Sequence, residues 1–93
     1  MPVFYFHIRS HDGLFLDEEG SEHASLAAAG LEAIRGARSL ISAEVEAGHV
    51  RLDQSIELFD EEGQHRSTVR FEDAFRITRA GDLEPQPVVD ALL

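Results

Sequence analysis

Three histidines near the start of the chain, together with two aspartates, are the residues that could bind a metal ion. His7, His11 and His23 lie close in sequence to Asp12 and Asp17, and imidazole nitrogen with carboxylate oxygen is a common ligand set for divalent metals. His7 and His11 are four residues apart, but we expect a strand end there and not a helix, so the pair matches no ligand template. We therefore predict no metal site and no cofactor, and partly exposed histidines on a hairpin.

The sequence Asp-Glu-Glu-Gly is a second candidate, because it occurs at residues 17–20 and again at residues 60–63. A calcium-binding EF-hand loop needs oxygen ligands at alternating positions and a distant glutamate, and this short motif offers neither. Glycine supplies the positive φ of a tight turn, and aspartate accepts hydrogen bonds from the backbone just after it. We interpret the repeat as one kind of turn used at two strand ends.

Motifs of catalysis are missing from the sequence. There is no cysteine, which excludes disulfides and thiolate chemistry. We find no nucleophile elbow, no phosphate-binding glycine loop and no pair of carboxylates that could be placed across a cleft. We predict that the protein is not an enzyme and has no catalytic residues.

The composition argues against several partners. The 93 residues include 18 acidic side chains and eight basic ones, all arginine, for a net charge of −10. An acidic chain repels nucleic-acid phosphates and anionic lipids, so we expect neither nucleic-acid nor membrane binding. No basic segment followed by a long apolar run opens the chain, and no stretch reaches the roughly 20 apolar residues of a spanning helix. We expect a cytoplasmic protein.

The elements that position these residues can be read from hydrophobic periodicity. Residues 3–9 and 14–16 alternate with period two and predict a first hairpin, with Phe4, Phe6 and Ile8 on one face. Ser25 is a helix N-cap and Gly48 a C-terminal stop, so a helix of about 22 residues is expected between them. Its apolar arc, with small residues in the middle that would lie on the sheet, consists of Leu26, Ala29, Gly30, Ala33, Ile34, Ala37, Leu40, Ile41 and Val45.

Alternation returns after the helix and predicts a second hairpin. Ile56 and Leu58 fall on one face of this segment, and Glu57 and Phe59 fall on the other. Residues 64–71 alternate again beyond the second turn. The fold class is therefore α+β in the order ββαββ, a four-stranded antiparallel sheet with one long helix packed on one face. We expect a single domain over residues 1–75 and a partly irregular C-terminal extension over residues 76–93, whose apolar end docks on the protein.

The sheet face opposite the helix is the candidate functional surface. Aromatic residues and arginine are enriched in the cores of protein interfaces, and with a single helix nothing obvious covers this face. By alternation His65 and Ser67 belong to the helix side. The candidate interaction face consists of Tyr5, His7, Arg9, Phe15, Phe59, Arg66 and Arg70, with Thr68 between the last two.

Three uses of this face stay open on sequence grounds. It can be a solvated face, partly covered by the C-terminal segment. It can bind a second copy of the chain, because small soluble proteins commonly form two-fold dimers. It can bind another protein or a single-stranded nucleic acid, although the acidic charge counts against the latter. We expect a non-enzymatic, homodimerising interaction module.

The first twenty residues, MPVFYFHIRSHDGLFLDEEG, resemble the start of a family of short uncharacterised alphaproteobacterial proteins. These typically begin Met-Pro-Arg-Tyr-Phe-Phe-His and continue with an Asp-Gly turn, Asp-Glu-Glu-Gly and a long alanine-rich helix. The resemblance implies a fold and a cytoplasmic bacterial setting, but no activity. Val3, His65, Ser67 and Arg70 depart from the family pattern. A later segment, LFDEEGQHRSTVRFEDA, resembles the family at Asp60, Glu61, Gly63, Thr68, Val69, Phe71, Asp73 and Ala74.

A second resemblance concerns the fold alone. A small sheet with one helix in an acidic chain is similar to HicB-type antitoxins, which neutralise a basic toxin, although no motif is shared. Together with the net charge of −10, this implies the alternative function, an acidic antitoxin-like or inhibitor protein that binds a basic partner.

Overall fold

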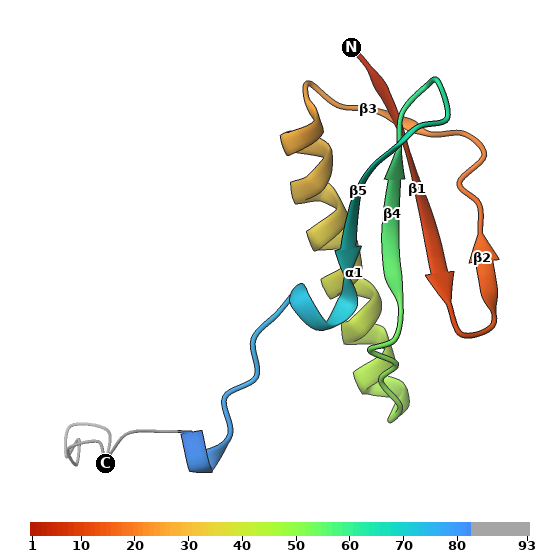
Figure 1. Ribbon diagram of the computed structural model, residues 1–93. Coiled ribbons are helices and arrows are strands. Elements are labelled where there is room, and N and C mark those ends of the chain that lie inside the picture. Colours follow the sequence, from red (N-terminus) through yellow and green to blue (C-terminus); the bar gives the residue numbers. More distant parts are fainter. Residues whose placement is uncertain (83–93) are drawn as a thin grey trace.

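A computed structural model describes residues 1–82 of the chain as one α-helix and an antiparallel sheet (Figure 1). The protein is therefore α+β, as predicted. Two 3-10 helices, η1 and η2, follow the sheet. In chain order the elements are β1 (Val3–Ser10), β2 (Gly13–Phe15), β3 (Ser21–Glu22), α1 (Leu26–Ala47), β4 (Ser55–Phe59), β5 (His65–Arg70), η1 (Phe71–Asp73) and η2 (Ala80–Asp82).

The sheet has five strands and not the four that we predicted. Its strand order is β2-β1-β4-β5, and the additional strand, β3, pairs with β1 beside β2. Ser21 lies opposite Phe4, and Glu22 lies opposite Val3. The order along the chain is thus βββαββ. Nothing in the sequence indicates β3, because two residues are too few to show a period-two pattern.

The helix begins and ends where its capping residues predicted. The side chain of Ser25 accepts a hydrogen bond of 3.1 Å from the backbone N–H of Ala28. At the other end Gly48 adopts a φ of 86° and donates to the carbonyl of Val45 at 3.0 Å, while His49 donates to Glu44 at 3.1 Å. Both ends therefore satisfy backbone groups that a helix terminus leaves without partners.

The buried side of α1 is narrower than the predicted arc. The fully enclosed positions repeat every four residues, and Gly36 lies against Ile56, where an added Cβ would be 3.8 Å from Cδ1. The prediction was wrong for Leu40 and Val45, which are 41% and 61% exposed, and for Gly30, which has no atom within 4 Å of an added Cβ. The buried helix residues are Ala29, Ala33, Ala37 and Ile41.

The core lies between this alanine stripe and the sheet. Leu58 on β4 and Phe71 just after β5 are its largest fully buried side chains. Phe71 also donates its N–H to the carbonyl of Gln54 at 2.9 Å, and Arg38 on α1 donates to the carbonyl of Ala74 at 2.6 Å. These bonds fix η1 against both layers of the protein.

The chain leaves the domain after η1. Residues 76–81 are exposed, and Figure 1 shows this segment running away from the sheet towards η2. The expectation that the apolar C-terminal end docks on the protein concerns residues 88–93, which lie outside the described residues.

Candidate interaction face

The sheet face opposite α1, here called the open face, is defined by the strand register. Residues directly opposite one another on paired strands project to the same side of a sheet. Tyr5 pairs with Phe59, His7 with Glu57, and further pairs extend this side onto β2 and β5. The open face consists of Tyr5, His7, Arg9, Leu14, Ser55, Glu57, Phe59, His65, Thr68 and Arg70.

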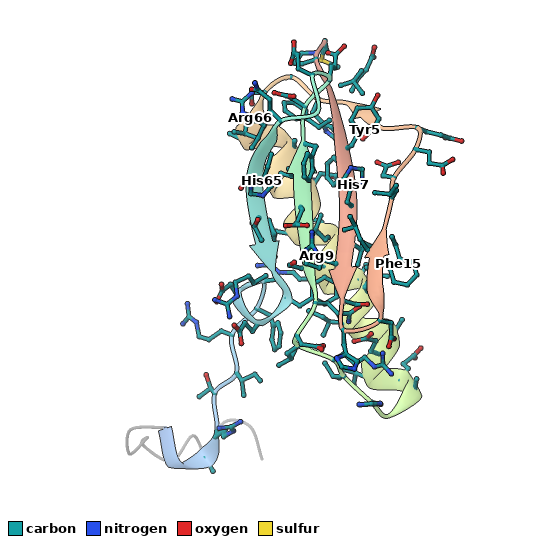
Figure 2. The ribbon with its side chains drawn as sticks, turned by 45° about the vertical axis from the view of Figure 1, so that its right-hand side comes forward. Tyr5, His7, Arg9, Phe15, His65 and Arg66 are labelled. Atoms are coloured by element: carbon teal, nitrogen blue, oxygen red, sulfur yellow. The ribbon has the colours of Figure 1, made fainter. Side chains whose placement is uncertain are left out.

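Most of the residues that alternation assigned to this face lie on it. Figure 2 shows Tyr5, His7 and Arg9 in succession along β1. Phe59 lies opposite Tyr5 on β4, and Arg70 lies opposite Ser55 at the end of β5. The structure therefore brings together residues from three strands that are up to 65 positions apart in sequence.

Phe15 is not part of the open face, contrary to our prediction. It pairs with Ile8, whose side chain packs against the core beneath α1. Phe15 thus lies on the helix side, at the sheet edge, where it is 59% exposed (Figure 2). Leu14, opposite Arg9, takes its place on the open face. The turn between β1 and β2 sets this register, and a shift of one residue exchanges the two faces of a strand.

His65 and Arg66 also differ from the prediction, because a β-bulge interrupts the pairing of β4 with β5. Leu58 pairs with Ser67, but its neighbour Phe59 pairs with His65, so Arg66 is the extra residue. The bulge brings His65 to the open face and takes Arg66 out of the alternating pattern. The guanidinium of Arg66 instead bonds to the carboxylate of Asp60, at 3.4 Å.

Four rings form a continuous row across one end of the open face. Tyr5 and His7 stack with centroids 6.3 Å apart, and His7 lies 5.0 Å from Phe59, which in turn lies 5.3 Å from His65. These spacings fall within the range of favourable ring pairs. This ring row, defined as Tyr5, His7, Phe59 and His65, crosses from β1 over β4 to β5.

Paired polar groups occupy the other end of the open face. Arg9 Nε lies 2.9 Å from Glu57 Oε2, and the Glu57 side chain is only 16% exposed. Arg70 forms an ion pair with Glu72, and His65 Nε2 lies 2.7 Å from the hydroxyl of Thr68. The open face carries two arginines and one glutamate, in contrast to the acidic chain as a whole.

Asp17, the first residue of the first acidic turn, holds β1 in place. One of its carboxylate oxygens accepts from the N–H of Phe6 at 3.1 Å, and the other accepts from the N–H of Gly20 at 3.1 Å. Its own N–H donates to Nδ1 of His7 at 3.0 Å. Gly20 has a φ of 70°, and an added Cβ would lie 2.8 Å from Val3 and 2.9 Å from Tyr5. Asp17 and Gly20 therefore position two members of the ring row.

Asp60, the first residue of the second acidic turn, accepts hydrogen bonds within that turn. Its Oδ1 accepts from the N–H groups of Glu62 and Gln64, at 3.0 and 2.9 Å. The hydrogen bond from Gln64, with those from Arg66 and Glu62, holds the pKa of Asp60 below its usual value against the opposing effect of burial. Gly63 closes the turn with a φ of 78°. Residues 60–63 form a turn in which Gly63 also donates to the carbonyl of Asp60 at 3.1 Å, whereas residues 17–20 form a bend held by the Asp17 side chain. Both copies change the direction of the chain between strands, but they are not one kind of turn as we predicted.

The structure separates the histidines that could have bound a metal. His7 accepts from Asp17, while His23 lies on the helix side of the sheet, beside Phe6 and 2.8 Å from the hydroxyl of Ser21. His11 is at the opposite end of the molecule, in the turn after β1. Among residues 1–82 no three histidine or carboxylate side chains are grouped so that they could hold a metal ion.

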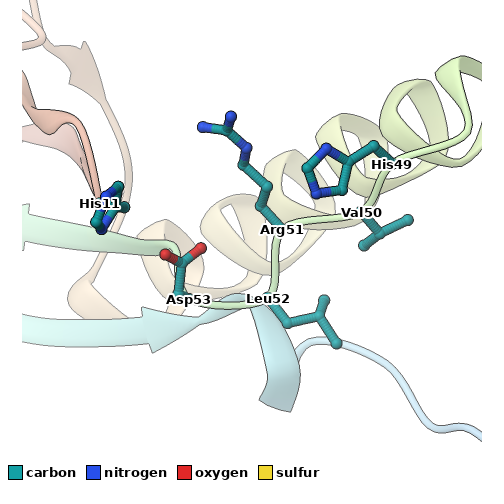
Figure 3. A pocket seen from close by; sticks show the side chains of 6 residues that line it. All are labelled: His11, His49, Val50, Arg51, Leu52 and Asp53. Atoms are coloured by element: carbon teal, nitrogen blue, oxygen red, sulfur yellow. The ribbon is translucent and has the colours of Figure 1, made fainter.

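An open hollow of about 400 Å³ lies at the end of the sheet beside the C-terminus of α1 (Figure 3). His11, His49 and Arg51 line it, and Arg51 is bound to the carboxylate of Asp12 at 2.8 Å. All three are exposed. The hollow therefore contains polar side chains in contact with water but no enclosed polar group that would orient a substrate.

Glu44 fixes the loop that forms this hollow. Its Oε1 accepts from the N–H of Arg51 at 3.0 Å, and its Oε2 accepts from the side-chain amide of Gln54 at 3.0 Å. The bond from Arg51 is the main cause that lowers the pKa of Glu44 from its usual value. The loop between α1 and β4 is thus tied back to the last turns of the helix.

The comparison with protein families decides where this chain belongs. Residues 3–72, which contain every strand and the whole open face, match the model of a domain of unknown function, DUF6894. The chain belongs to the DUF6894 family. A search of curated proteins and a search of solved structures found no match. Within the described residues, this DUF6894 chain has no helix that is both long and apolar enough to cross a membrane.

Proposed function

We propose that this DUF6894 chain is a non-enzymatic interaction module that self-associates, one copy contacting a second through the open face. The observation that carries the proposal is the ring row, which no element of residues 1–82 covers. Tyrosine and phenylalanine supply large contact areas in interface cores at a small cost in side-chain entropy.

The charges of the open face support self-contact. A net charge of −10 opposes association of two copies, but the charged groups of this face are already paired, Arg9 with Glu57 and Arg70 with Glu72. Two such faces can approach without placing uncompensated like charges together. In a two-fold arrangement, Arg9 of one copy can also meet Glu57 of the other, because the same patch serves both sides.

Molar mass in solution, measured by light scattering over a concentration series, tests the proposal. We expect a mass approaching twice the 10.3 kDa of one chain. Phe59→Glu places a charge in the centre of the ring row and should return the protein to the monomer. Leu31→Glu is the matched control, because Leu31 is a 59% exposed residue of α1 outside the open face; this variant should still dimerise. A wild-type chain that stays monomeric at every concentration contradicts the proposal.

A specific feature also favours the alternative, an acidic antitoxin-like protein or inhibitor of a basic partner. Five exposed glutamates gather where β1 begins, because the loop before β3, β3 itself and the turn after β4 all lie there. Glu61 reaches the N–H of Val3 at 3.0 Å. The five are Glu18, Glu19, Glu22, Glu61 and Glu62.

Affinity capture from the extract of the native cell tests this alternative. The wild-type chain should retain a basic protein that a variant with all five glutamates changed to glutamine does not retain. Capture of acidic proteins only, or equal capture by both chains, rules the alternative out.

We propose in addition a bacterial, cytoplasmic setting, which rests on the resemblance of the first twenty residues to alphaproteobacterial proteins. Fractionation of the native cells followed by immunodetection is the direct test. Detection in the periplasmic or membrane fraction would overturn this placement.

A further inference from the structure

The two sides of the sheet differ in whether the outward backbone groups of their long strands, β1 and β5, have partners. The outer edge of β1 is fully covered: β2 pairs with it from Ile8 to Ser10, and β3 pairs with it at Val3 and Phe4. Between these two strands the carboxylate of Asp17 accepts the N–H of Phe6. Two short strands and one carboxylate thus pair with the backbone on this side of β1.

The opposite edge, the outer side of β5, has no such cover in residues 1–82. Phe71 donates to Gln54, the residue just before β4, so the backbone groups of alternate residues, Val69 and Ser67, also point towards β4. The N–H and C=O groups of Thr68 and Arg70 consequently point away from the sheet. Such an edge is a template for pairing with another extended segment.

The segment of the sequence that contains this edge has a charge opposite to that of the remaining chain. Residues 64–79 contain four arginines and two carboxylates, whereas the other residues contain four arginines and sixteen carboxylates. Arg66 and Arg70 lie at the two ends of the pairing segment of β5. Each is paired with one carboxylate of the chain, yet their side chains remain 45% and 63% exposed, and Arg76 is exposed just beyond η1. An approaching acidic segment is attracted here and repelled elsewhere.

A hollow lies where the end of β5 meets the start of β4. It has a volume of about 530 Å³ and is lined by Thr68, Arg70 and Glu72 from β5 and η1 and by Leu52, Asp53, Gln54 and Ser55 from the start of β4 and the loop before it. Strand-addition sites combine main-chain hydrogen bonds, which give affinity, with hollows for alternate side chains, which give specificity. Both components are present next to β5.

We propose that the free edge of β5 accepts an extended, acidic segment of a partner protein as an additional strand. The main-chain groups of Thr68 and Arg70 bind the backbone of the segment, and the arginine-rich surroundings select carboxylate side chains. The hollow beside Thr68 receives one side chain of the segment. The side chains of Thr68 and Arg70 belong to the open face, but their outward main-chain groups lie at the sheet edge. Strand addition there does not depend on self-association through the ring row.

A synthetic peptide tests the main-chain part directly, because strand addition tolerates many sequences. The probe is an acetylated peptide of about seven residues, the length of a typical strand, in which glutamate and valine alternate. Its lysine–valine counterpart and a version N-methylated at alternate amides are the controls. Titration into ¹⁵N-labelled full-length protein, up to about 2 mM for an interaction of millimolar strength, should shift the amide signals of Thr68 and Arg70 most.

The controls make the expected result specific. The acidic peptide should bind at least about tenfold more tightly than the lysine peptide, with a difference that shrinks at high salt. N-methylation should abolish binding, since it removes the donors that face β5. On the protein, Thr68→Pro removes an N–H that points outwards and should abolish binding, whereas Thr68→Val keeps that N–H and should still bind.

Several outcomes would overturn the proposal. These are no shift at the highest concentration, equal binding of the N-methylated peptide, or shifts centred on the ring row instead of β5. Shifts of Thr68 and Arg70 that depend on protein concentration without peptide would assign the edge to a second copy of the chain. Phe59→Glu, designed against self-association through the open face, should bind the peptide as the wild type does, which separates the two proposals.

Discussion

The backbone N–H of Asp17 donates a 3.0 Å hydrogen bond to Nδ1 of His7. The corner that residues 17–20 form after β2 is therefore in direct contact with the ring row. The bond requires that Nδ1 carries no proton, because only the unprotonated nitrogen can accept. It therefore fixes the tautomer of a neutral His7, with the hydrogen on Nε2. It also orients the imidazole between Tyr5 and Phe59.

Replacing His7 separates the role of its ring from that of its nitrogen. We expect His7→Phe to lower the free energy of unfolding by about 1 kcal/mol, because the ring contacts persist while the N–H of Asp17 loses its acceptor. His7→Asn supplies an acceptor close to the position of Nδ1 and should keep the amide of Asp17 slow in hydrogen exchange. If exchange of this amide is unchanged in His7→Phe, the hydrogen bond does not order the corner.

A pair of glycines with the same backbone conformation tests the close packing behind Tyr5. Gly20→Ala should cost about 3 kcal/mol, since a left-handed φ of 70° and contacts of 2.8 and 2.9 Å with Val3 and Tyr5 add together. Gly63→Ala, with a φ of 78° but open space around the added Cβ, should cost about 1 kcal/mol. Urea unfolding of both variants gives the comparison. Equal losses would mean that backbone conformation alone matters at Gly20.

The parts of this fold that the sequence predicts are those decided by local chemistry. Ser25 and Gly48 set the helix bounds through hydrogen bonds within the first and last turns. The alternation of β1 and β4 assigns Tyr5, His7 and Phe59 to the correct face, since side chains along a regular strand can only alternate.

The parts that it does not predict depend on contacts between distant residues. The bulge opposite Phe59 moves His65 to the open face and takes Arg66 out of the alternation, and no residue type in β5 indicates it. The carboxylate of Asp17 replaces a strand partner at Phe6, eleven residues away. Val45 is exposed because α1, at about 33 Å, is longer than a strand of six to eight residues, at about 20 to 26 Å, so the last turns pass the end of the sheet (Figure 1).

Asp60 should make the stability of the protein sensitive to acid. Its pKa in the folded state is lowered, chiefly by the N–H of Gln64, so the unfolded chain binds the proton more tightly. The stabilisation is therefore complete above the pKa of an unfolded aspartate, about 3.9, and is lost as the pH falls through the lower folded-state pKa.

Asp60→Asn tests this dependence because asparagine keeps an oxygen for the turn but carries no charge. We expect the variant to be less stable than the wild type near neutral pH. The difference should shrink as the pH falls through the lowered folded-state pKa of Asp60, because the wild-type carboxylate is then protonated. Asp53→Asn, in an exposed loop position, is the control and should leave the pH profile unchanged. Thermal unfolding over a pH series gives both curves. A constant difference between wild type and Asp60→Asn at all pH values would contradict the assignment.

The alanine stripe of α1 predicts how closely the helix must approach the sheet. Ala33 is fully buried in the middle of this stripe and belongs to the same core cluster as Ile56 and Leu58 of β4. Ala33→Leu should lower the free energy of unfolding by about 2 kcal/mol, because the added carbons must push the helix away from a filled core. Ala27→Leu makes the same chemical change on the exposed side of the helix and should stay within about 0.5 kcal/mol of the wild type. Chemical denaturation measures both, and a tolerated leucine at Ala33 would show that the two layers have space between them and that the small residues are not required by the packing.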